Sequence, residues 1–351
     1  MIDLNTYGWN HGVSRLKEAS AYNVLAHGRI STVHRTCYEV VSENGLFQCE
    51  LTGNMIYGKT DSGLPCTGDW VIFQLFDDYK GIIVDMLPRE RTLYRRKSGT
   101  VANKQAIASY VDKAFIVQSL DDNFNVRRAE RFMVQILEEN IKPVLILNKA
   151  DLGIDKQRIE EQIEHLTRQI PVFFTSIHQP QTILRLRESV SEGETVVFVG
   201  SSGVGKSSLV NALCQKPVLL TSDISASTGK GRHTSTRREM VLMDNSGVLI
   251  DTPGVREFGL AIGNPGSLAE ILEISDYAQS CRFKNCKHTG EPGCAVLEAV
   301  KSGLLDSEVY ESYLKLRREA WHFSASEYEK RKKDKSLSKL VYEVKKRKMN
   351  F

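Results

Sequence analysis

The stretch TVVFVGSSGVGKSSLVNALC, residues 195–214, decides the fold of the middle of this chain. Its first five residues predict a buried strand, and the segment from Lys206 onward predicts a helix. The loop between them matches the glycine-rich phosphate-binding loop, in the strand–loop–helix context that such a loop requires. Glycines let backbone N–H groups point at a phosphate, and the helix N-terminus adds positive partial charge.

We therefore predict a nucleotide site here, in which Lys206 contacts the β and γ phosphates and Ser207 binds Mg²⁺. The residues of the predicted loop are Gly200, Ser201, Ser202, Gly203, Val204, Gly205, Lys206, Ser207 and Ser208.

A second nucleotide element follows further along the chain. Asp251-Thr252-Pro253-Gly254 matches the D-x-x-G switch and comes directly after a predicted strand at 247–250. Because Pro-Gly occurs in many turns, the match is weak alone, but its position after a phosphate loop makes it strong. We expect Asp251 to hold Mg²⁺ directly or through water, and the N–H of Gly254 to reach the γ phosphate.

A third element indicates which base is bound. Residues 148–151, directly after a predicted strand at 143–147, match the motif N-K-x-D. A carboxylate at Asp151 accepts hydrogen bonds from N1–H and the 2-amino group of guanine, whereas adenine has an acceptor at N1 and no 2-amino group. We expect Lys149 to lie along the base and Asn148 to tie this segment to the phosphate loop. The end of a strand at 172–174 can aim a backbone N–H at guanine O6. The expected base-binding residues are Asn148, Lys149, Ala150, Asp151, Thr175 and Ser176.

The order of the three motifs is unusual. An ordinary GTPase presents the phosphate loop first, D-x-x-G second and N-K-x-D last. Here N-K-x-D at 148–151 precedes the phosphate loop at 200–208. The sequence therefore predicts a circularly permuted GTPase that hydrolyses GTP to GDP and phosphate.

The segment TGKGRHTST, residues 228–236, lies between the phosphate loop and D-x-x-G. It is glycine-rich, polar and basic, which suits a first switch that γ phosphate and Mg²⁺ would order. Thr234 is the expected Mg²⁺ ligand of this switch, and Thr236 is the second choice.

The catalytic water has no evident partner. Many GTPases place glutamine directly after D-x-x-G to orient the attacking water, but this chain has Val255 there. His233 in the switch is the candidate replacement. The expected catalytic residues are thus His233, Lys206 and Thr234, and we expect slow intrinsic hydrolysis until a partner completes the site.

The flanking regions predict two further domains. Short alternating runs between residues 27 and 92 predict five strands of an antiparallel barrel; an OB-fold is the leading candidate, although an SH3-like barrel gives nearly the same pattern. From about residue 108, strands alternate with helices, which predicts a parallel α/β sheet. The end of the chain is mainly helical. We predict an OB-like RNA-binding domain at 1–97, a permuted GTPase domain at 98–264 and a zinc-finger domain at 265–351.

Three of the seven cysteines lie close together with a histidine. Cys281, Cys286, His288 and Cys294 fall within fourteen residues. Three thiolates and one imidazole form a closed tetrahedral set for structural zinc, whereas disulfide pairing would leave one cysteine over. We therefore predict one structural Zn²⁺ in this region.

Composition restricts the class of protein. Charged residues make up 26% of the chain and its longest apolar runs are strand-sized, which is typical of a soluble protein with no membrane span. No secretory signal pattern is evident at the N-terminus, so we expect a cytoplasmic protein. Residues 330–351 are strongly basic on a mildly acidic body, which favours contact with a polyanion over a merely solvated helix end.

Taken together, the permuted motifs, the G-R-H-T switch and the C-x₄-C-x-H-x₅-C finger resemble the RsgA/YjeQ family of bacterial small-ribosomal-subunit biogenesis GTPases. The resemblance covers essentially the whole chain. It implies GTP hydrolysis stimulated by the small ribosomal subunit, a role in late maturation of that subunit and binding to its rRNA. It also implies GTP at 148–151 and 200–208, and zinc at the finger. We expect a monomer.

Two other functions fit the same motifs. A GTP-regulated RNA-binding switch or RNA chaperone would need the same nucleotide site without any ribosome. A GTPase whose barrel grips a protein would need no RNA. Whether ribosomal subunits, free RNA or neither accelerates GTP turnover separates the three.

Overall fold

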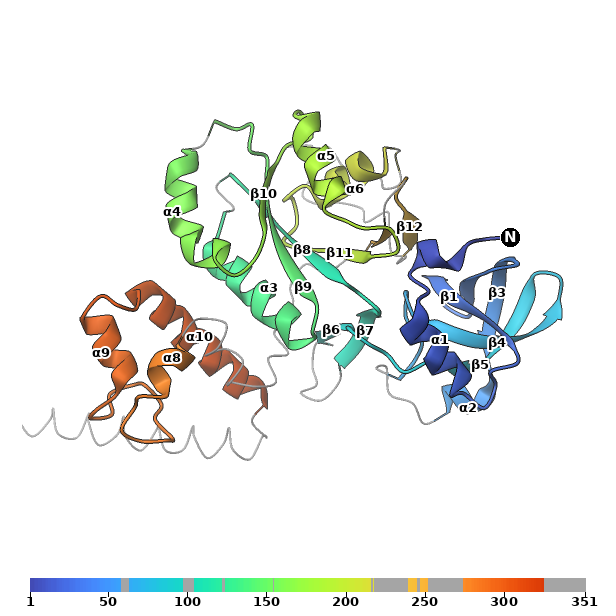
Figure 1. Cartoon of the computed structure of the whole chain (residues 1–351), viewed down its shortest axis with the longest axis horizontal. Coiled ribbons are helices and arrows are strands. Elements are labelled where there is room, and N and C mark those ends of the chain that lie inside the picture. The colour runs from blue at the N-terminus through green and yellow to red at the C-terminus, as the bar shows by residue number, and fades with distance from the viewer. Residues whose placement is uncertain are drawn as a thin grey trace, which may run out of the picture. The chain divides into compact units, whose positions relative to one another are not determined.

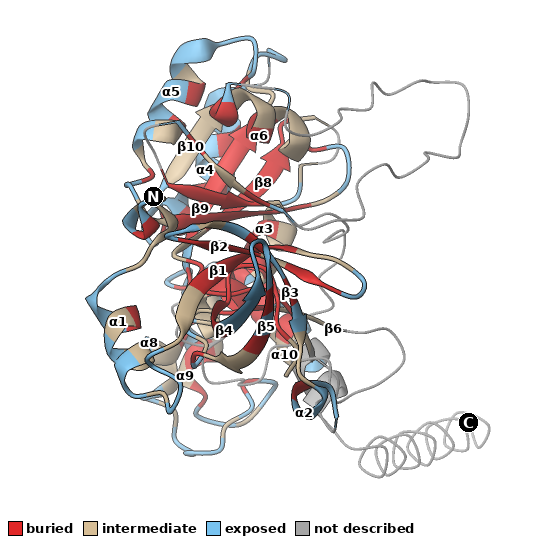
Figure 2. Cartoon of the chain, turned by 90° about the vertical axis from the view of Figure 1, so that its right-hand side faces the viewer, coloured by how far each residue is buried: buried red, intermediate tan, exposed pale blue. Residues whose placement is uncertain are grey.

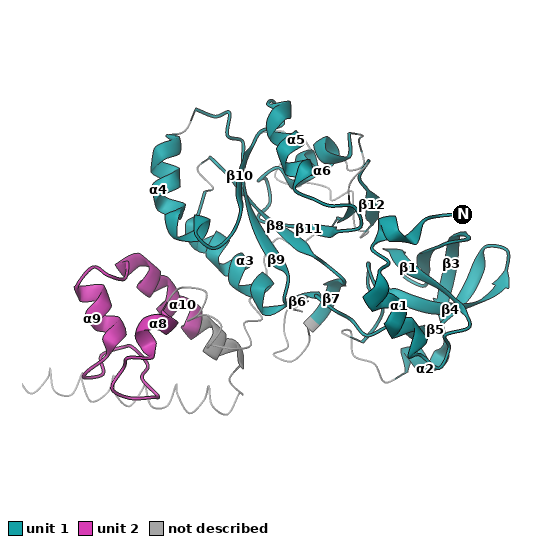
Figure 3. Ribbon diagram, in the orientation of Figure 1, with its two compact units in different colours: residues 1–259 teal, residues 260–351 magenta. Residues whose placement is uncertain are grey.

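The structure is a computed structural model, and it describes residues 1–57, 63–96, 104–121, 124–153, 155–215, 217, 239–244, 247–251 and 274–324. The chain divides into two compact units, residues 1–259 and residues 260–351 (Figure 3). The predicted boundaries near residues 97 and 264 lie outside the described residues, so the division into three domains stays a prediction.

The N-terminal part of the first unit is a closed five-stranded barrel (Figure 1, blue). Its strands are β1 (Ala26–Val33), β2 (Tyr38–Ser42), β3 (Gly45–Leu51), β4 (Trp70–Asp77) and β5 (Lys80–Met86). The order around the barrel is β1-β2-β3-β5-β4, with β3 parallel to β5 and β4 closing on β1. This order is that of an OB-fold rather than of a simple up-and-down barrel, so the predicted fold is confirmed.

Alternating side chains fill the barrel. In β3, Phe47 and Cys49 are buried while Gln48 and Glu50 face outward, as the period of two in the sequence predicts. Three short helices accompany the barrel: η1 (Leu4–Tyr7), α1 (His11–Glu18) and α2 (Gly53–Ile56). The Asn10 side chain accepts from the N–H of Val13 at 3.1 Å and so caps α1.

The rest of the first unit contains a six-stranded sheet in the order β10-β9-β8-β11-β13-β12. Its strands are β8 (Lys113–Ser119), β9 (Lys142–Asn148), β10 (Val172–Thr175), β11 (Thr195–Val199), β12 (Met240–Leu242) and β13 (Val248–Ile250). All pairs are parallel except β12 with β13, which are antiparallel. A separate antiparallel pair, β6 (Leu93–Arg96) and β7 (Lys104–Ala108), precedes the sheet.

Helices cover this sheet, and the four strands between its two edges, β9, β8, β11 and β13, are buried almost completely (Figure 2, red), whereas the edge strands β10 and β12 are mostly half-buried. The helices are α3 (Val126–Glu138), α4 (Lys156–Thr167), α5 (Pro180–Glu188) and α6 (Lys206–Cys214). Phe115 and Phe198, from neighbouring strands, pack edge to face in one core with Leu186 of α5 and Leu209 of α6. The near-continuous apolar strands of the sequence are therefore those of a sheet buried on both faces, as predicted.

A buried arginine helps to join the barrel to the sheet. Arg29 of β1 is 1% exposed, and its guanidinium donates to Thr195 Oγ1, the first residue of β11, at 2.9 Å. It also donates to the carbonyls of Gly68 at 2.9 Å and of Tyr7 at 2.5 Å. One side chain thus ties the barrel to the strand that leads into the phosphate loop.

The described part of the second unit is helical, as predicted. It comprises α8 (Ser275–Ala278), α9 (Ala295–Lys301) and α10 (Ser307–Ser324). The predicted metal ligands lie between α8 and α9, and Cys294 is the residue directly before α9. Among the described residues, no helix has the length and apolar character needed to cross a bilayer.

Candidate nucleotide and metal sites

The phosphate-binding loop connects β11 to α6, as predicted. Gly200, Gly203 and Gly205 all have positive φ, of 149°, 82° and 92°. A Cβ on Gly205 would lie 2.3 Å from Asn148 Nδ2, so both the conformation and the close approach require glycine there. The Lys206 ammonium donates to the carbonyls of Gly200 at 2.8 Å and Ser201 at 2.6 Å. It therefore lies against the backbone of its own loop.

The N-K-x-D segment lies against this loop although it comes earlier in the chain. Asn148 ends β9 and is buried. Its Nδ2 donates to the carbonyl of Val204 at 2.9 Å, and its Oδ1 accepts from Thr175 Oγ1 at 3.1 Å. The N–H of Ala150 donates to the carbonyl of Thr175 at 3.0 Å. Asn148 thus connects three segments: its own, the phosphate loop and the end of β10.

Two charged residues of the same segment are accessible to solvent. Lys149 has a φ of +62°, a left-handed conformation that is uncommon for a residue with a Cβ. Asp151 is exposed, and a hydrogen bond from the Ser176 side chain is the main cause that lowers the pKa of its carboxyl group. Asp151 is therefore ionised at neutral pH and available as an acceptor.

Ser176 belongs to the segment from which we expect a backbone N–H to reach guanine O6. Its own N–H donates to Thr182 Oγ1 at 3.0 Å. Thr175 and Ser176 are both fully buried. In this conformation the two residues support Asn148 and Asp151 rather than present a free donor at Ser176.

Parallel strands bring the motifs to one edge of the sheet. β9, β10, β11 and β13 run in the same direction, so the segments after them meet at their carboxyl ends. Asp251 directly follows β13, the neighbour of β11, and its N–H donates to the carbonyl of Glu239 at 3.1 Å. The predicted Mg²⁺ ligands Ser207 and Asp251 therefore follow adjacent strands. His233, Thr234 and Gly254 lie outside the described residues.

One polar group at this edge was not predicted. Asp121 follows β8, between β9 and β11, and its Oδ2 accepts from Lys149 Nζ at 2.8 Å. The sequence carries a signal for it, since an aspartate pair at 121–122 ends an apolar strand as the other site segments do.

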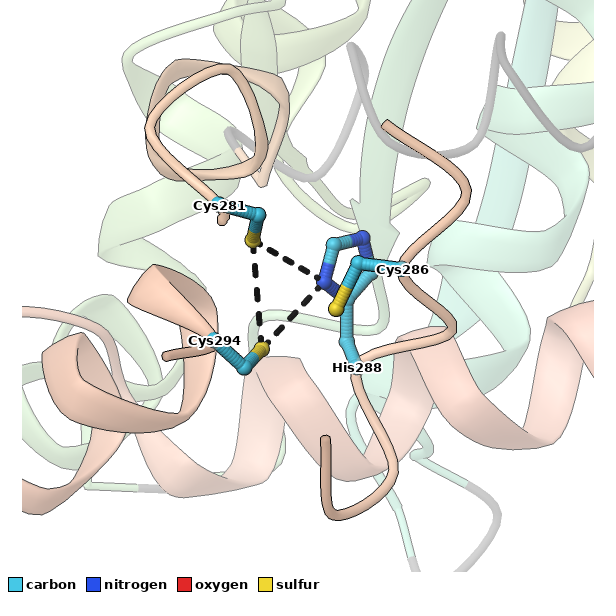
Figure 4. Close-up of side chains that lie close together, drawn as sticks. All are labelled: Cys281, Cys286, His288 and Cys294. Carbon is cyan, nitrogen blue, oxygen red and sulfur yellow. Dashed lines mark hydrogen bonds between the residues drawn. The ribbon is translucent and has the colours of Figure 1, made fainter. Parts of the chain in front are cut away.

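The four predicted metal ligands converge in the second unit (Figure 4). The donor atoms of Cys281, Cys286, His288 and Cys294 all lie within 4.8 Å of one another. Nδ1 of His288 is 3.5 Å from Cys281 Sγ and 3.4 Å from Cys294 Sγ. The two sulfurs are 3.9 Å apart, far beyond the roughly 2.05 Å of a disulfide bond. This set can hold a metal ion.

Neighbouring groups hold the ligand loop in shape. His288 has a left-handed φ of +55°, and Tyr310 of α10 donates its hydroxyl to the His288 carbonyl at 2.5 Å. The Glu291 carboxylate accepts backbone N–H groups, among them those of Thr289 at 2.8 Å and Lys287 at 3.1 Å. These bonds lower the pKa of Glu291 to about 2.

Strand order and motif positions together define the class of this protein: a phosphate-loop GTPase with a circularly permuted chain. Solved structures agree on the fold. "YjeQ from Thermotoga maritima" matches with a TM-score of 0.65 at 24% identity, covering 84% of this chain and 98% of that one. "YloQ, a circularly permuted GTPase" matches with a TM-score of 0.64, also at 24% identity, covering 87% and 98%.

Sequence comparison identifies the family. The model of the RsgA GTPase family matches residues 86–261. "Small ribosomal subunit biogenesis GTPase RsgA 1" of Bacteroides thetaiotaomicron is 75% identical over 349 residues, which are 99% of this chain and 98% of that protein. A protein of Methanosarcina acetivorans, "Small ribosomal subunit biogenesis GTPase RsgA", is 40% identical over 89% of this chain and 84% of its own length. The chain belongs to the RsgA family of GTPases.

Proposed function

We propose that this GTPase acts in late maturation of the small ribosomal subunit, and that docking on the subunit and its rRNA stimulates its hydrolysis of GTP. The two relatives align with nearly the whole chain, and their names support this role. The observation that carries the nucleotide assignment is the bond from Asn148 Nδ2 to the Val204 carbonyl, 2.9 Å long. It holds the base-recognition and phosphate-recognition segments together despite their inverted order in the sequence.

Recognition of guanine falls to Asp151. Its carboxylate accepts from N1–H and the 2-amino group, and the hydrogen bond from the Ser176 side chain lowers its pKa. The aliphatic part of Lys149 lies along the base. Adenine nucleotides are rejected because adenine N1 is an acceptor and would face a second acceptor.

The phosphates lie over residues 200–208. The Lys206 ammonium donates to the carbonyls of Gly200 and Ser201, and it would contact the β and γ phosphates of a bound nucleotide. Ser207, Thr234 and Asp251 would hold Mg²⁺, since hydroxyl and carboxylate oxygens suit this hard cation. When bound, Mg²⁺ supplies positive charge at the β and γ phosphate oxygens. The N–H of Gly254 adds a donor to the γ phosphate.

Hydrolysis joins a water oxygen to the γ phosphorus and breaks the bond to the β–γ bridging oxygen, which leaves GDP and phosphate. Val255 has no group that orients the water. We infer that His233 accepts a hydrogen bond from it once the ribosomal subunit orders residues 228–236.

The metal of the second unit is zinc in this proposal. A tetrahedral ion with zinc–sulfur bonds of about 2.3 Å separates its sulfur ligands by about 3.8 Å. The sulfurs of Cys281 and Cys294 are 3.9 Å apart, which fits this separation. Bound zinc would stabilise the fold of this unit and would have no catalytic role.

The partner surfaces are the barrel, the metal-binding unit and the basic segment 330–351. OB barrels and zinc modules both serve nucleic-acid binding, and a run of lysines and arginines suits a phosphate backbone. The protein works in the cytoplasm and as a monomer in this proposal.

Co-sedimentation tests the role. The purified chain should pellet with small ribosomal subunits to an extent that depends on whether GDP or a non-hydrolysable GTP analogue is bound. Cells that lack the gene should accumulate precursors of small-subunit rRNA. Nucleotide-dependent binding to free RNA alone, with normal rRNA processing, would favour an RNA chaperone instead.

A further inference from the structure

The ammonium of Lys149 is held by a carboxylate. It lies 2.8 Å from Oδ2 of Asp121, and both side chains are about one-third exposed, at 29% and 31%. Asp121 belongs to none of the three nucleotide motifs. It reaches Lys149 because it follows β8, the strand beside β9.

Asp121 is itself oriented by its surroundings. The hydroxyl of Ser119, which is fully buried, donates to Asp121 Oδ1 at 2.7 Å. The N–H of Leu120 donates to the carbonyl of Asn148 at 2.8 Å and extends the pairing of β8 with β9 up to the base-recognition segment. One carboxylate oxygen is thus fixed by the sheet, and the other faces Lys149.

Lys149 needs such support for two reasons. Its left-handed backbone, with φ of +62°, is intrinsically unfavourable for a residue with a Cβ. Its long side chain would lose considerable rotamer freedom when it settles along a base. A partner that orders the ammonium beforehand lowers the entropy lost on nucleotide binding.

We propose that Asp121 is a positioning residue for guanine nucleotide binding, which holds the Lys149 side chain in the orientation that the base requires. This rests on the proposed base-binding role of residues 148–151. The opposite effect, in which Asp121 withholds Lys149 from the nucleotide, would make removal of the carboxylate strengthen binding.

The test uses the full chain and a fluorescent GDP, with dissociation constants and dissociation rates measured by stopped flow. Asp121→Ala should weaken GDP and GTP binding equally, by roughly two- to fivefold, because a partly exposed ion pair contributes a modest energy. Asp121→Asn keeps an oxygen acceptor for Lys149 and should lose less. The turnover number at saturating GTP should stay unchanged, because the pair is on the base side of the site. Glu164→Gln, which removes an exposed ion pair between Glu164 of α4 and Arg168 directly after that helix, is the matched control and should change nothing.

A double-mutant cycle with Lys149→Ala separates positioning from a general structural role. If Asp121 acts through Lys149, Asp121→Ala should have no further effect on affinity once Lys149 is alanine. In the wild-type background its effect should shrink toward zero at about 1 M salt, where the screening length falls to about 3 Å. An equal loss in both backgrounds, or tighter binding by Asp121→Ala, overturns the proposal.

The same cycle reports on the underlying assignment. If Lys149→Ala alone leaves guanine nucleotide affinity intact, the base-binding role of residues 148–151 fails. If Lys149→Ala weakens binding but Asp121→Ala does not, only the role of Asp121 fails.

Discussion

Asn148 donates from Nδ2 to the backbone carbonyl of Val204 over 2.9 Å, and so links two motifs that lie in reversed order along the chain. We expect the nucleotide site to depend on this link, because the two motifs follow different strands of the sheet. The sheet order β9-β8-β11 separates the two strands by one intervening strand, and the Asn148 side chain bridges that gap at the carboxyl end.

Removing this link should loosen both halves together. Asn148→Ala deletes the bond to Val204 and the bond accepted from Thr175, both of them buried. Each buried bond contributes about 1 kcal/mol, so guanine nucleotide affinity should fall by roughly ten- to thirtyfold. Titration with fluorescent GDP and GTP measures this. Equal affinities of the variant and the wild type would show that the bond has no part in nucleotide binding.

Base specificity should follow the carboxylate of Asp151. Asp151→Asn replaces an acceptor with a donor, which suits the O2 carbonyl of xanthine in place of the 2-amino group of guanine. The variant should lose affinity for GDP and gain affinity for XDP, as competition titrations would measure. An unchanged affinity for GDP would show that Asp151 does not contact the base.

The buried Arg29 should be essential for the stability of the first unit. Burial lowers its pKa to about 10, which still leaves the guanidinium charged at neutral pH. Arg29→Met would leave the acceptors at Tyr7, Gly68 and Thr195 without this hydrogen-bond donor. The substitution should lower the free energy of unfolding by about 3 kcal/mol or more. Urea denaturation measures the loss. Arg15→Met, at an exposed position on α1, is the control and should change stability by less than about 0.5 kcal/mol. A similar stability for both variants would contradict the role given to Arg29.

One tightly bound zinc per chain should be found by elemental analysis. Cys286→Ser should lower the zinc content and unfold the ligand loop locally, whereas Cys37→Ser in the barrel should keep the metal. Protease sensitivity of residues 274–324 should increase in the first variant only. A Cys286→Ser protein that retains full zinc would show that the ligand set is different.

The sequence predicts the fold wherever a pattern is local. The alternation of apolar and polar residues in β3 and the continuous apolar runs of β8 and β9 predict the ends of these strands to within one or two residues. The short helices α1 and α5 were not predicted, because they have only eight and nine residues and each buries only one or two side chains.

The parts of the site that lie within sequence motifs were predicted. The parts that depend on contacts between distant residues were not. The ligand cluster and the N-K-x-D segment have fixed spacings. Arg29 and Asp121 act through partners at distant positions, Thr195 and Lys149, and no spacing in the sequence records those pairs. The left-handed backbone of Lys149 is also invisible in the sequence, because lysine has no preference for that conformation.

GTP turnover by the purified chain, with and without small ribosomal subunits, tests the central claim most directly. We expect slow turnover alone, since Val255 cannot orient water, and an acceleration of at least about tenfold by subunits. His233→Ala should bind nucleotide normally but lose most of that acceleration, and Lys206→Ala serves as the inactive control against contaminating hydrolases. Turnover that subunits leave unchanged, or that free RNA accelerates equally, would contradict a GTPase whose activator is the small ribosomal subunit.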